Sequence, residues 1–234
     1  MTQPASSSPP TARKNLRVLI IEDHTLFAES LELALTFEGY DVRRAPIAEA
    51  GSPTALLSAA IRMHPRIALL DLDLGRFGDG VRLIRPLVGA GINVVVVTAS
   101  GERARWGECL RYGARTVLQK TRPLNEILAV VRRINQGFPV MDRAEREELV
   151  QLWHDQQSER EQLQQRLLLL TPREKEVLGH LMHGQTVRDI ASLSVVSEAT
   201  VRTQVKSILA KLEVSSQLAA VGLAHHVNWR PNGQ

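Results

Sequence analysis

Side chains capable of phosphoryl chemistry follow the ends of short apolar segments in the first half of this 234-residue chain. Four acids, one hydroxyl and one ammonium fall at such points: Glu22, Asp23, Asp71, Asp73, Thr98 and Lys120. Carboxylates that lie close together repel one another unless a cation occupies the space between them, and oxygen ligands at this density favour Mg²⁺. The pattern therefore predicts a magnesium site, provided that the fold brings these segment ends to one place.

Three of these side chains also predict a reaction. With a metal bound, Asp71 can attack a phosphoryl donor and become an aspartyl phosphate. Lys120 would pair with one phosphoryl oxygen as a point charge, and the Thr98 hydroxyl would donate a hydrogen bond to another. A salt-bridge network of carboxylates and lysine without any chemistry is the alternative interpretation. The neighbouring His24 either borders the acidic site or, as the favoured interpretation, caps a helix or is solvated.

The segments between residues 16 and 137 predict the scaffold that would gather these groups. Five strands are expected, at Arg17–Ile21, Asp41–Ala45, Ile67–Leu72, Asn93–Thr98 and Thr116–Gln119. Helices are expected between and after them, at Thr25–Phe37, Pro53–Met63, Gly80–Val88, Arg103–Tyr112 and Leu124–Gln136. This alternation favours an α/β doubly wound (βα)5 domain with a parallel sheet covered on both faces. Ligands of such sheets bind beyond the carboxyl ends of the strands, where the polar side chains fall.

Residues 138–170 differ in composition, because they contain no Gly or Pro after Pro139 and are rich in Gln and Leu. The segment from Asp142 to Leu168 predicts one helical linker, with acids near its start that complement the helix dipole. Gln156 and Arg160 interrupt its apolar positions. We therefore expect its apolar side to pack on the chain's own domains or on a partner subunit, rather than to form an independent coiled coil.

Residues 171–234 predict a small all-α domain of four helices. Helix starts are marked by three N-cap residues, Thr171, Thr186 and Ser197. A helix-turn-helix is predicted from the helix Val187–Leu193, the turn Ser194–Val196 and the helix Ser197–Leu212. On the second helix, Arg202, Thr203 and Lys206 lie away from the apolar stripe and suit base and phosphate contacts in a major groove. A solvated face on a helical bundle is the alternative interpretation of these three residues.

Composition narrows the class of protein. Hydrophobic residues make up 44% and charged residues 23%, and the net charge of +4 permits nucleic-acid binding without establishing it. A single cysteine excludes a disulfide framework and fits a reducing compartment. No apolar run approaches the ~20 residues that cross a bilayer, and residues 1–15 resemble a disordered tail rather than a signal peptide. We therefore expect a cytoplasmic protein without a membrane partner.

Four segments of the first domain resemble the receiver domains of bacterial response regulators. They are Ile20-Ile21-Glu22-Asp23, Leu69-Leu70-Asp71-Leu72-Asp73, Val96-Val97-Thr98-Ala99 and Leu118-Gln119-Lys120. The resemblance covers residues 16–137. It implies that a partner histidine kinase phosphorylates Asp71, and that Mg²⁺ is held by Glu22, Asp23, Asp71 and the backbone carbonyl of Asp73.

Two positions depart from the receiver pattern. Leu74-Gly75 replaces the Met-Pro that commonly follows the acceptor, and Val117 stands where an aromatic switch residue is expected. A valine cannot make the inward ring rotation that is usually coupled to the hydroxyl of Thr98. These departures keep open a DNA-binding regulator whose receiver works independently of phosphorylation.

An enzyme is a less favoured alternative. Asp71-Leu72-Asp73 also resembles the Asp-x-Asp of haloacid-dehalogenase-type phosphatases. Those enzymes place the pair on the first strand and need further acids after the lysine strand. Here the pair is on the third predicted strand, an acid pair precedes it, and Lys120 is followed by Thr121-Arg122-Pro123. We therefore expect no enzymatic turnover.

The C-terminal segments look like the DNA-binding domain of the LuxR/NarL family. They are Leu170-Thr171-Pro172-Arg173-Glu174-Lys175-Glu176-Val177-Leu178, Asp189-Ile190-Ala191, Thr200-Val201-Arg202-Thr203-Gln204-Val205 and Lys211-Leu212. The resemblance implies DNA contacts by Arg202, Thr203 and Lys206, and a last helix, Ser216–His226, that supports dimerisation on DNA. The whole chain is thus expected to be a phosphorylation-controlled transcriptional regulator that binds an inverted-repeat operator in double-stranded DNA as a homodimer.

Overall fold

The computed structural model describes residues 16–231, which fall into two compact units divided between Trp153 and His154. The division lies inside the long helix α6 (Arg143–Leu168), so each unit contains one part of that helix. The Asp142 carboxylate starts α6 by accepting a hydrogen bond from the Ala144 backbone N–H at 2.8 Å. The single helix expected from Asp142 to Leu168 is confirmed. The domain boundaries at 15/16, 137/138 and 170/171 stay predictions, and the expected tail lies outside the described residues.

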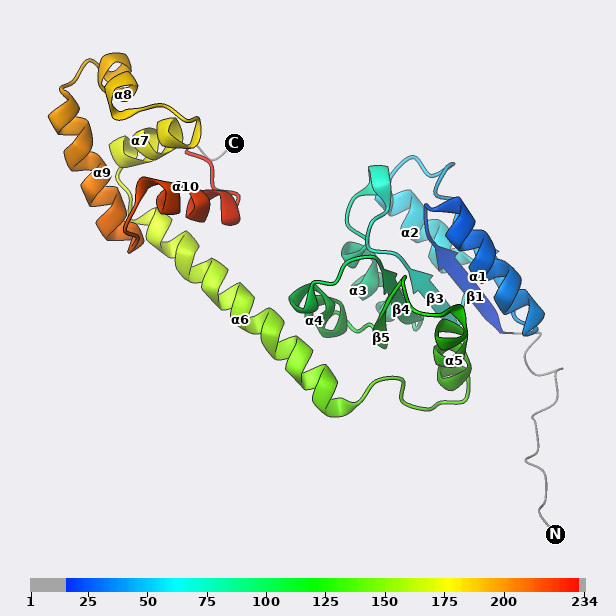
Figure 1. Ribbon diagram of the computed structural model, residues 1–234. Helices are drawn as coiled ribbons and strands as arrows, with labels where there is room; N and C mark the ends of the chain where they lie inside the picture. The colour runs from blue at the N-terminus through cyan, green and yellow to red at the C-terminus, as the bar shows by residue number, and fades with distance from the viewer. Residues whose placement is uncertain (1–15, 232–234) are drawn as a thin grey trace, which may run out of the picture. The chain divides into compact units, whose positions relative to one another are not determined.

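The first unit is built on a five-stranded parallel sheet in the order β2-β1-β3-β4-β5 (Figure 1). The strands are β1 (Arg17–Ile21), β2 (Asp41–Arg44), β3 (Ile67–Leu70), β4 (Asn93–Thr98) and β5 (Thr116–Gln119). Every residue of β3 is buried, as expected for an inner parallel strand covered on both faces. The doubly wound fold is confirmed.

The third strand ends earlier than the sequence predicted. Asp71 and Leu72 lie beyond β3, although the apolar run continues through Leu72. The Asp71 backbone N–H still donates to the Ile21 carbonyl, but the Leu72 N–H donates to the Asp71 carboxylate at 2.7 Å. The side chain of Asp71 therefore takes a backbone donor that the strand ladder would otherwise use.

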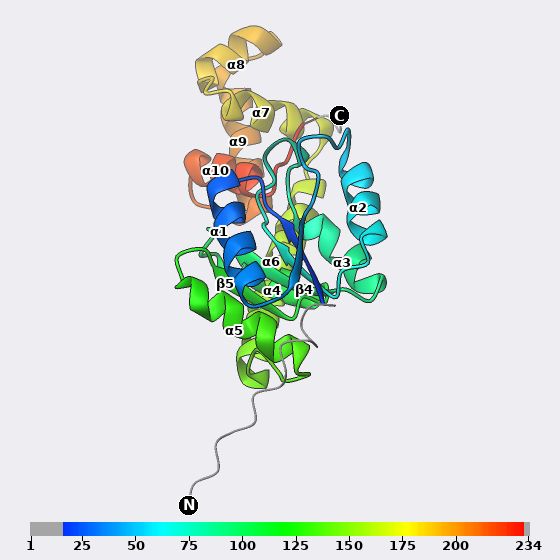
Figure 2. The ribbon, with the colours of Figure 1, turned by 90° about the vertical axis from the view of Figure 1, so that its right-hand side faces the viewer.

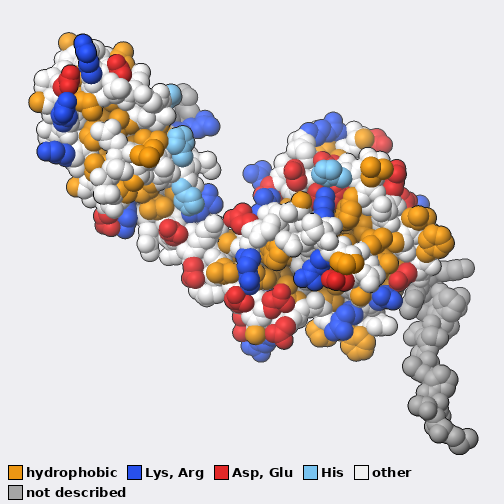
Figure 3. Space-filling view, viewed as in Figure 1, with side chains coloured by type: hydrophobic (Ala, Val, Ile, Leu, Met, Phe, Trp, Pro, Cys, Tyr) orange, Lys and Arg blue, Asp and Glu red, His pale blue; other side chains and the backbone are white. Residues whose placement is uncertain are grey.

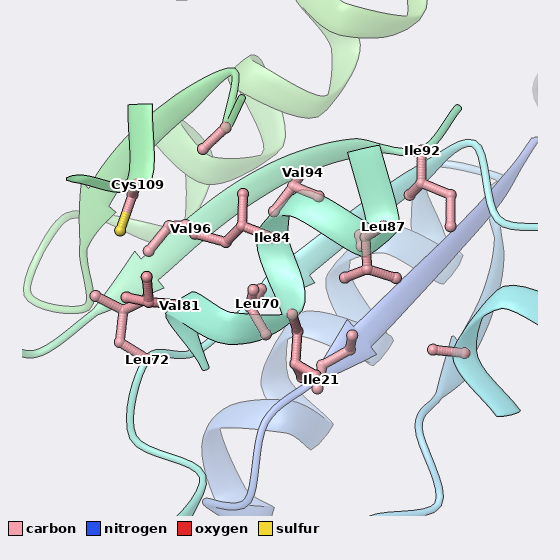
Figure 4. Close-up of a cluster of buried hydrophobic side chains, with 14 of the residues drawn as sticks. Ile21, Leu70, Leu72, Val81, Ile84, Leu87, Ile92, Val94, Val96 and Cys109 are labelled. Atoms are coloured by element: carbon pink, nitrogen blue, oxygen red, sulfur yellow. The ribbon is translucent and has the colours of Figure 1, made fainter. Parts of the chain in front are cut away.

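Helices cover both faces of the sheet (Figure 2). One face carries α1 (Thr25–Phe37) and α5 (Leu124–Asn135), whose buried side chains meet those of the sheet in one core cluster. The other face carries α2 (Pro53–Arg62), α3 (Val81–Gly89) and α4 (Arg103–Arg111). In this second cluster Ile84 and Leu87 of α3 lie against strand residues such as Val94 (Figure 4). Each such side chain contributes about 1.5–3 kcal/mol on burial, so the two clusters fix the strand ends in place.

The first part of α6 packs against α4. A Cβ atom at Gly107 of α4 would overlap the Leu149 carbonyl oxygen of α6, so the two backbones touch at this glycine. Leu149 is 2% exposed and belongs to the same core cluster as α3 and α4. The Arg146 guanidinium donates to the backbone carbonyls of Leu110 at 2.7 Å and Ala114 at 3.0 Å. The linker helix therefore packs on the chain's own domain, as its interrupted apolar pattern predicted.

The second unit contains the last part of α6 and four further helices. They are α7 (Pro172–Met182), α8 (Val187–Ser194), α9 (Glu198–Leu212) and α10 (Gln217–His226). The predicted N-caps are confirmed: Thr171 and Thr186 each form a capping box, and the Ser197 hydroxyl accepts from the Thr200 N–H. The unit closes around one apolar cluster that includes Leu167, Ile190 and Ile208.

A helix that spans a membrane needs about 20 predominantly apolar residues. Among residues 16–231 no single helix meets that requirement. The pair α9 and α10, with a bend of 53° between them, meets it jointly by length and composition only.

The contact at Gly107 predicts an inverted glycine effect. Gly→Ala in a helix normally stabilises by roughly 0.5–1 kcal/mol. Gly107→Ala is expected instead to destabilise the first unit by about 1–3 kcal/mol, because the new methyl group must displace the α6 backbone. Urea unfolding followed by fluorescence of Trp106 and Trp153 measures this. Gly89→Ala at the end of α3 is the matched control, since a Cβ there meets nothing within 4 Å. Equal effects of the two substitutions would contradict the packing described.

Candidate functional site

The carboxyl ends of β1, β3, β4 and β5 bring the predicted polar groups to one edge of the sheet. Glu22 is 7% exposed, Asp71 3% and Thr98 3%, so three polar side chains are buried together with little water. Buried carboxylates are costly unless they are paired and hydrogen-bonded. The site therefore has to supply compensating donors.

Lys120, directly after β5, supplies the charge that these carboxylates need. Its Nζ lies 2.7 Å from Asp71 Oδ2 and 2.7 Å from Glu22 Oε2. Burial of the ammonium alone would lower its pKa, but hydrogen bonds to Asp71 and Glu22 and their charges raise the pKa above its usual value. Lys120 is consequently protonated at neutral pH and holds Asp71 at the edge of the sheet.

His24 borders the site, which was the less favoured of the interpretations that the sequence left open. It occupies the N-cap position of α1, but its side chain makes no capping hydrogen bond, so the expected capping role is wrong. Its Nδ1 lies 3.0 Å from Glu22 Oε1 and 3.1 Å from Asp23 Oδ1. Only its adjacency to Glu22-Asp23 in the sequence could have suggested this position.

The donor set suits a hard divalent cation. Ligand atoms of Glu22, Asp23, His24 and Asp71 all lie within 4.8 Å of one another. Three of these four side chains offer carboxylate oxygens, which are the ligands that Mg²⁺ prefers. The residues present therefore fit the expected ion.

The carboxylate of Asp73 is not part of this group. It is exposed, and its Oδ1 accepts a hydrogen bond from the Gly75 backbone N–H at 3.2 Å. The expectation that all four acids converge is therefore wrong for this side chain, because the turn after β3 uses it. A role for the Asp73 backbone carbonyl in metal binding stays a prediction.

The turn after β3 requires the glycine of Leu74-Gly75. Gly75 has φ +55°, and a Cβ there would lie 2.8 Å from Asp23 Oδ2. Proline cannot adopt this φ, and any side chain would crowd the carboxylate. The following Arg76 donates to the carbonyls of Ile47, Ala48 and Ala50, which fixes the short 3₁₀ turn Gly75–Phe77.

The second candidate site is the outer face of α9. Arg202 and Lys206 are exposed one turn apart, and Arg202 pairs with Glu198 at 3.1 Å. The Thr203 hydroxyl donates to the Ala199 carbonyl, so this side chain satisfies its hydrogen bond within the helix. Lys and Arg side chains are seen on the surface over α8 and α9 (Figure 3). The opposite side of α9 buries Val201, Val205, Ile208 and Leu212 in the core of the unit.

Glu174 fixes α9 to α7. It is 6% exposed, and its carboxylate accepts hydrogen bonds from Ser207 Oγ at 2.6 Å, Lys211 Nζ at 2.7 Å and the Thr171 N–H at 2.7 Å. Burial raises its pKa, but the hydrogen bonds from Lys211 and Ser207 prevail and lower the pKa to about 2. The sequence showed only its capping-box role, because Ser207 and Lys211 are distant in the chain.

Comparison with known families assigns both units. Residues 18–132 match the response regulator receiver domain, and residues 168–224 match the bacterial regulatory proteins of the luxR family. The chain belongs to the NarL/LuxR-type response regulators. As such it is a DNA-binding transcriptional regulator by family.

Full-length relatives have the same organisation. This response regulator is 29% identical over 216 residues to the response regulator protein VraR of Staphylococcus epidermidis, covering 91% of this chain and 98% of the relative. It is 26% identical over 216 residues to a nitrate/nitrite response regulator protein homolog of Haemophilus influenzae, with the same coverage. The fold is similar to that of the RcsB response regulator of Salmonella typhimurium, with a TM-score of 0.50, 20% identity, and 90% and 100% of the two chains covered.

The buried Glu174 predicts a pH-dependent stability of the DNA-binding unit. Its pKa is about 2 in the folded protein against an ordinary value of 4.5, which corresponds to about 3 kcal/mol of stabilisation when the carboxylate is ionised. The contribution is fully present above pH 4.5 and is lost as the pH falls towards 2. Glu174→Gln should therefore lower the opening free energy of α7 and α9 amides by about 2–3 kcal/mol at pH 7, and by less at pH 4, in hydrogen exchange.

The exposed Glu176, which pairs with Arg173, provides the matched control. Glu176→Gln should leave the protection of α9 unchanged. A loss of protection in Glu174→Gln that is as large at pH 4 as at pH 7 would show that packing, and not charge, explains the effect.

Proposed function

We propose that a histidine kinase phosphorylates Asp71 and that this modification controls the binding of this response regulator to DNA. The observation that carries the proposal is the buried Asp71 carboxylate at the end of β3, 2.7 Å from Lys120 Nζ. A carboxylate held in this way beside an ammonium is an oxygen nucleophile with a cation ready for the incoming phosphoryl group.

The transfer itself involves few protein groups. An Asp71 oxygen attacks the phosphorus of a phosphohistidine, so that a P–O bond forms as the P–N bond breaks. The leaving imidazole keeps the electron pair and takes up a proton. The charge of Lys120 offsets that of one phosphoryl oxygen, and the Thr98 hydroxyl donates a hydrogen bond to another. We expect one phosphoryl group per chain and no steady turnover of phosphomonoesters.

Mg²⁺ is proposed as the cofactor of this site. Glu22, Asp23, Asp71 and the Asp73 backbone carbonyl would hold it. When bound, it offsets the repulsion between the carboxylates and the charge of the phosphoryl group. The chain's own contribution is to keep the Glu22 and Asp71 side chains buried, fixed by Lys120 and by the Leu72 N–H.

The DNA interface is proposed on α9. Arg202 and Lys206 would contact bases or phosphates of a major groove, with the Thr203 methyl group facing outward because its hydroxyl is used within the helix. Helix α10 is proposed to support a homodimer, whose two-fold symmetry would match an inverted-repeat operator. The cytoplasmic location stays a prediction from the sequence.

One observation favours a second candidate, a receiver that acts without phosphorylation. Val117 is 6% exposed in the core cluster of α3 and α4, where the family usually has a mobile aromatic ring. The two candidates differ in whether loss of the acceptor changes DNA affinity.

Asp71→Asn tests the acceptor. The variant keeps the shape of the side chain but removes the nucleophile, so we expect it to fold and to gain no acid-labile phosphoryl group from a small phosphodonor with Mg²⁺. Intact-mass measurement gives the stoichiometry. Asp73→Asn, whose carboxylate lies in the turn, should be labelled like the wild type. Labelling of Asp71→Asn would move the acceptor elsewhere. Equal DNA affinity of the phosphorylated and unphosphorylated wild type would favour the second candidate.

Arg202→Ala and Lys206→Ala test the DNA interface. If Arg202 makes a bidentate contact to guanine, its loss should cost ~1–3 kcal/mol of discrimination and relax the sequence preference. A phosphate contact by Lys206 should instead weaken all sequences about equally and reduce the salt slope by roughly 1. Fluorescence anisotropy at several salt concentrations measures both. Arg173→Ala on α7 controls for the loss of one positive charge, and unchanged affinity in the double variant would exclude α9 as the interface.

A further inference from the structure

Two hydrogen bonds connect the phosphoacceptor site to α4. The Ser100 backbone N–H donates to Thr98 Oγ1 at 3.1 Å, and the Ser100 carbonyl accepts from the Trp106 indole Nε1–H at 2.9 Å. In the described part of the chain the Thr98 hydroxyl acts only as an acceptor in these bonds, so its own proton remains to be donated. A group that draws Thr98 towards Asp71 would therefore pull on Ser100 as well.

The indole belongs to the residue that directly precedes the contact between α4 and α6 in the sequence. Trp106 immediately precedes Gly107, the glycine against which the Leu149 carbonyl of α6 rests. Trp106 packs against the core cluster that contains Leu149. A displacement of the Trp106 ring would shift the α4 backbone at Gly107. Because no free space separates this backbone from that of α6, the shift would disturb the contact between the two helices.

The part of α6 from 143 to 153 has further attachments to the first unit. Arg146 donates to the last carbonyls of α4 and its turn, and the rings of Tyr112 and Trp153 meet edge to face at 6.5 Å. The pair Arg103–Glu148 is exposed and contributes little. The partner residues in these contacts, except Ala114, lie on α4 or directly after it. These contacts therefore attach α6 to α4.

The usual route from the hydroxyl to the surface is absent. Val117 is buried, has no polar atom and has no ring to rotate. Trp106, in contrast, has both a large ring and a hydrogen bond to Ser100 in the loop that follows Thr98. An aromatic side chain of α4, not of β5, is therefore hydrogen-bonded to the backbone two residues after Thr98.

We propose that Trp106 is a positioning residue that transmits phosphorylation of Asp71 to α6. A phosphoryl oxygen attracts the Thr98 hydroxyl, Ser100 follows, and its carbonyl withdraws from the indole. The contact of residues 143–153 with α4 then loosens. The inference rests on the proposed function, because it takes phosphorylation of Asp71 as the event that starts the movement.

Hydrogen exchange of the full chain tests the proposal, with and without acetyl phosphate and Mg²⁺, while intact mass records the phosphorylation of each sample. In the wild type we expect exchange in residues 143–153 to rise on phosphorylation by roughly 5- to 150-fold, the range typical of coupling between two sites. No labelling of the wild type would overturn the proposed function. Labelling without faster exchange in 143–153 would overturn the inference and leave the proposed function standing.

Trp106→Phe separates transmission from packing. It keeps an aromatic ring in the core but removes the N–H together with the five-membered ring of the indole, and labelling of Asp71 should equal that of the wild type. Exchange in 143–153 should then be the same in the two phosphorylation states. Trp229→Phe in the second unit is the matched control and should respond like the wild type. A response of wild-type size in Trp106→Phe would refute the role of the indole.

Gly107→Ala tests the same contact if Trp106→Phe fails to fold. The added methyl group should give fast exchange in 143–153 without any phosphodonor, with Asp71 still labelled. Slow exchange in that variant would show that α6 is not held at this glycine and would also overturn the proposal.

Discussion

The ion pair network of Lys120 with two buried carboxylates is the interaction on which the first unit depends. Glu22 and Asp71 directly follow different strands and would repel each other in a medium of low polarity. The ammonium between them, 2.7 Å from each, makes their burial tolerable. Removing one member of such a group leaves an unpaired buried charge, which is costly. The parallel sheet is what brings the three side chains together. The parallel strands of one sheet present their carboxyl ends, and hence these side chains, at the same edge.

The second unit solves the same physical problem with one acid. Glu174 is buried, but three donors from α7 and α9 satisfy it, and its pKa is about 2 as a result. This fixes α9 by its inner side through Ser207 and Lys211. The outer side, with Arg202 and Lys206, is thereby left facing solvent. A buried charge thus orients the helix that carries the proposed DNA contacts.

Glycines decide where backbones approach one another in the first unit. Gly75 lets the turn after β3 pass beside Asp23, and Gly107 lets α6 rest on α4. Gly75 shapes the candidate site at the edge of the sheet, and Gly107 sets the place where α6 contacts α4. Between them, the Trp106 indole donates a hydrogen bond to Ser100 in the loop that follows Thr98. The chemistry of the site and the position of the linker helix are therefore connected through few contacts.

The sequence by itself determined the elements, their order and the caps at Thr171, Thr186 and Ser197, because apolar periodicity and capping are local properties. It also indicated most of the residues at the candidate site, because strand ends in a parallel sheet meet at one edge. It misplaced the end of β3 and the carboxylate of Asp73, and it favoured a capping role for His24 that the structure does not show, since each depends on which donor the turn offers. Only the tertiary structure decided the contacts at Gly107 and Glu174. Those contacts join residues more than thirty positions apart, and no local pattern records which side chains will meet at that distance.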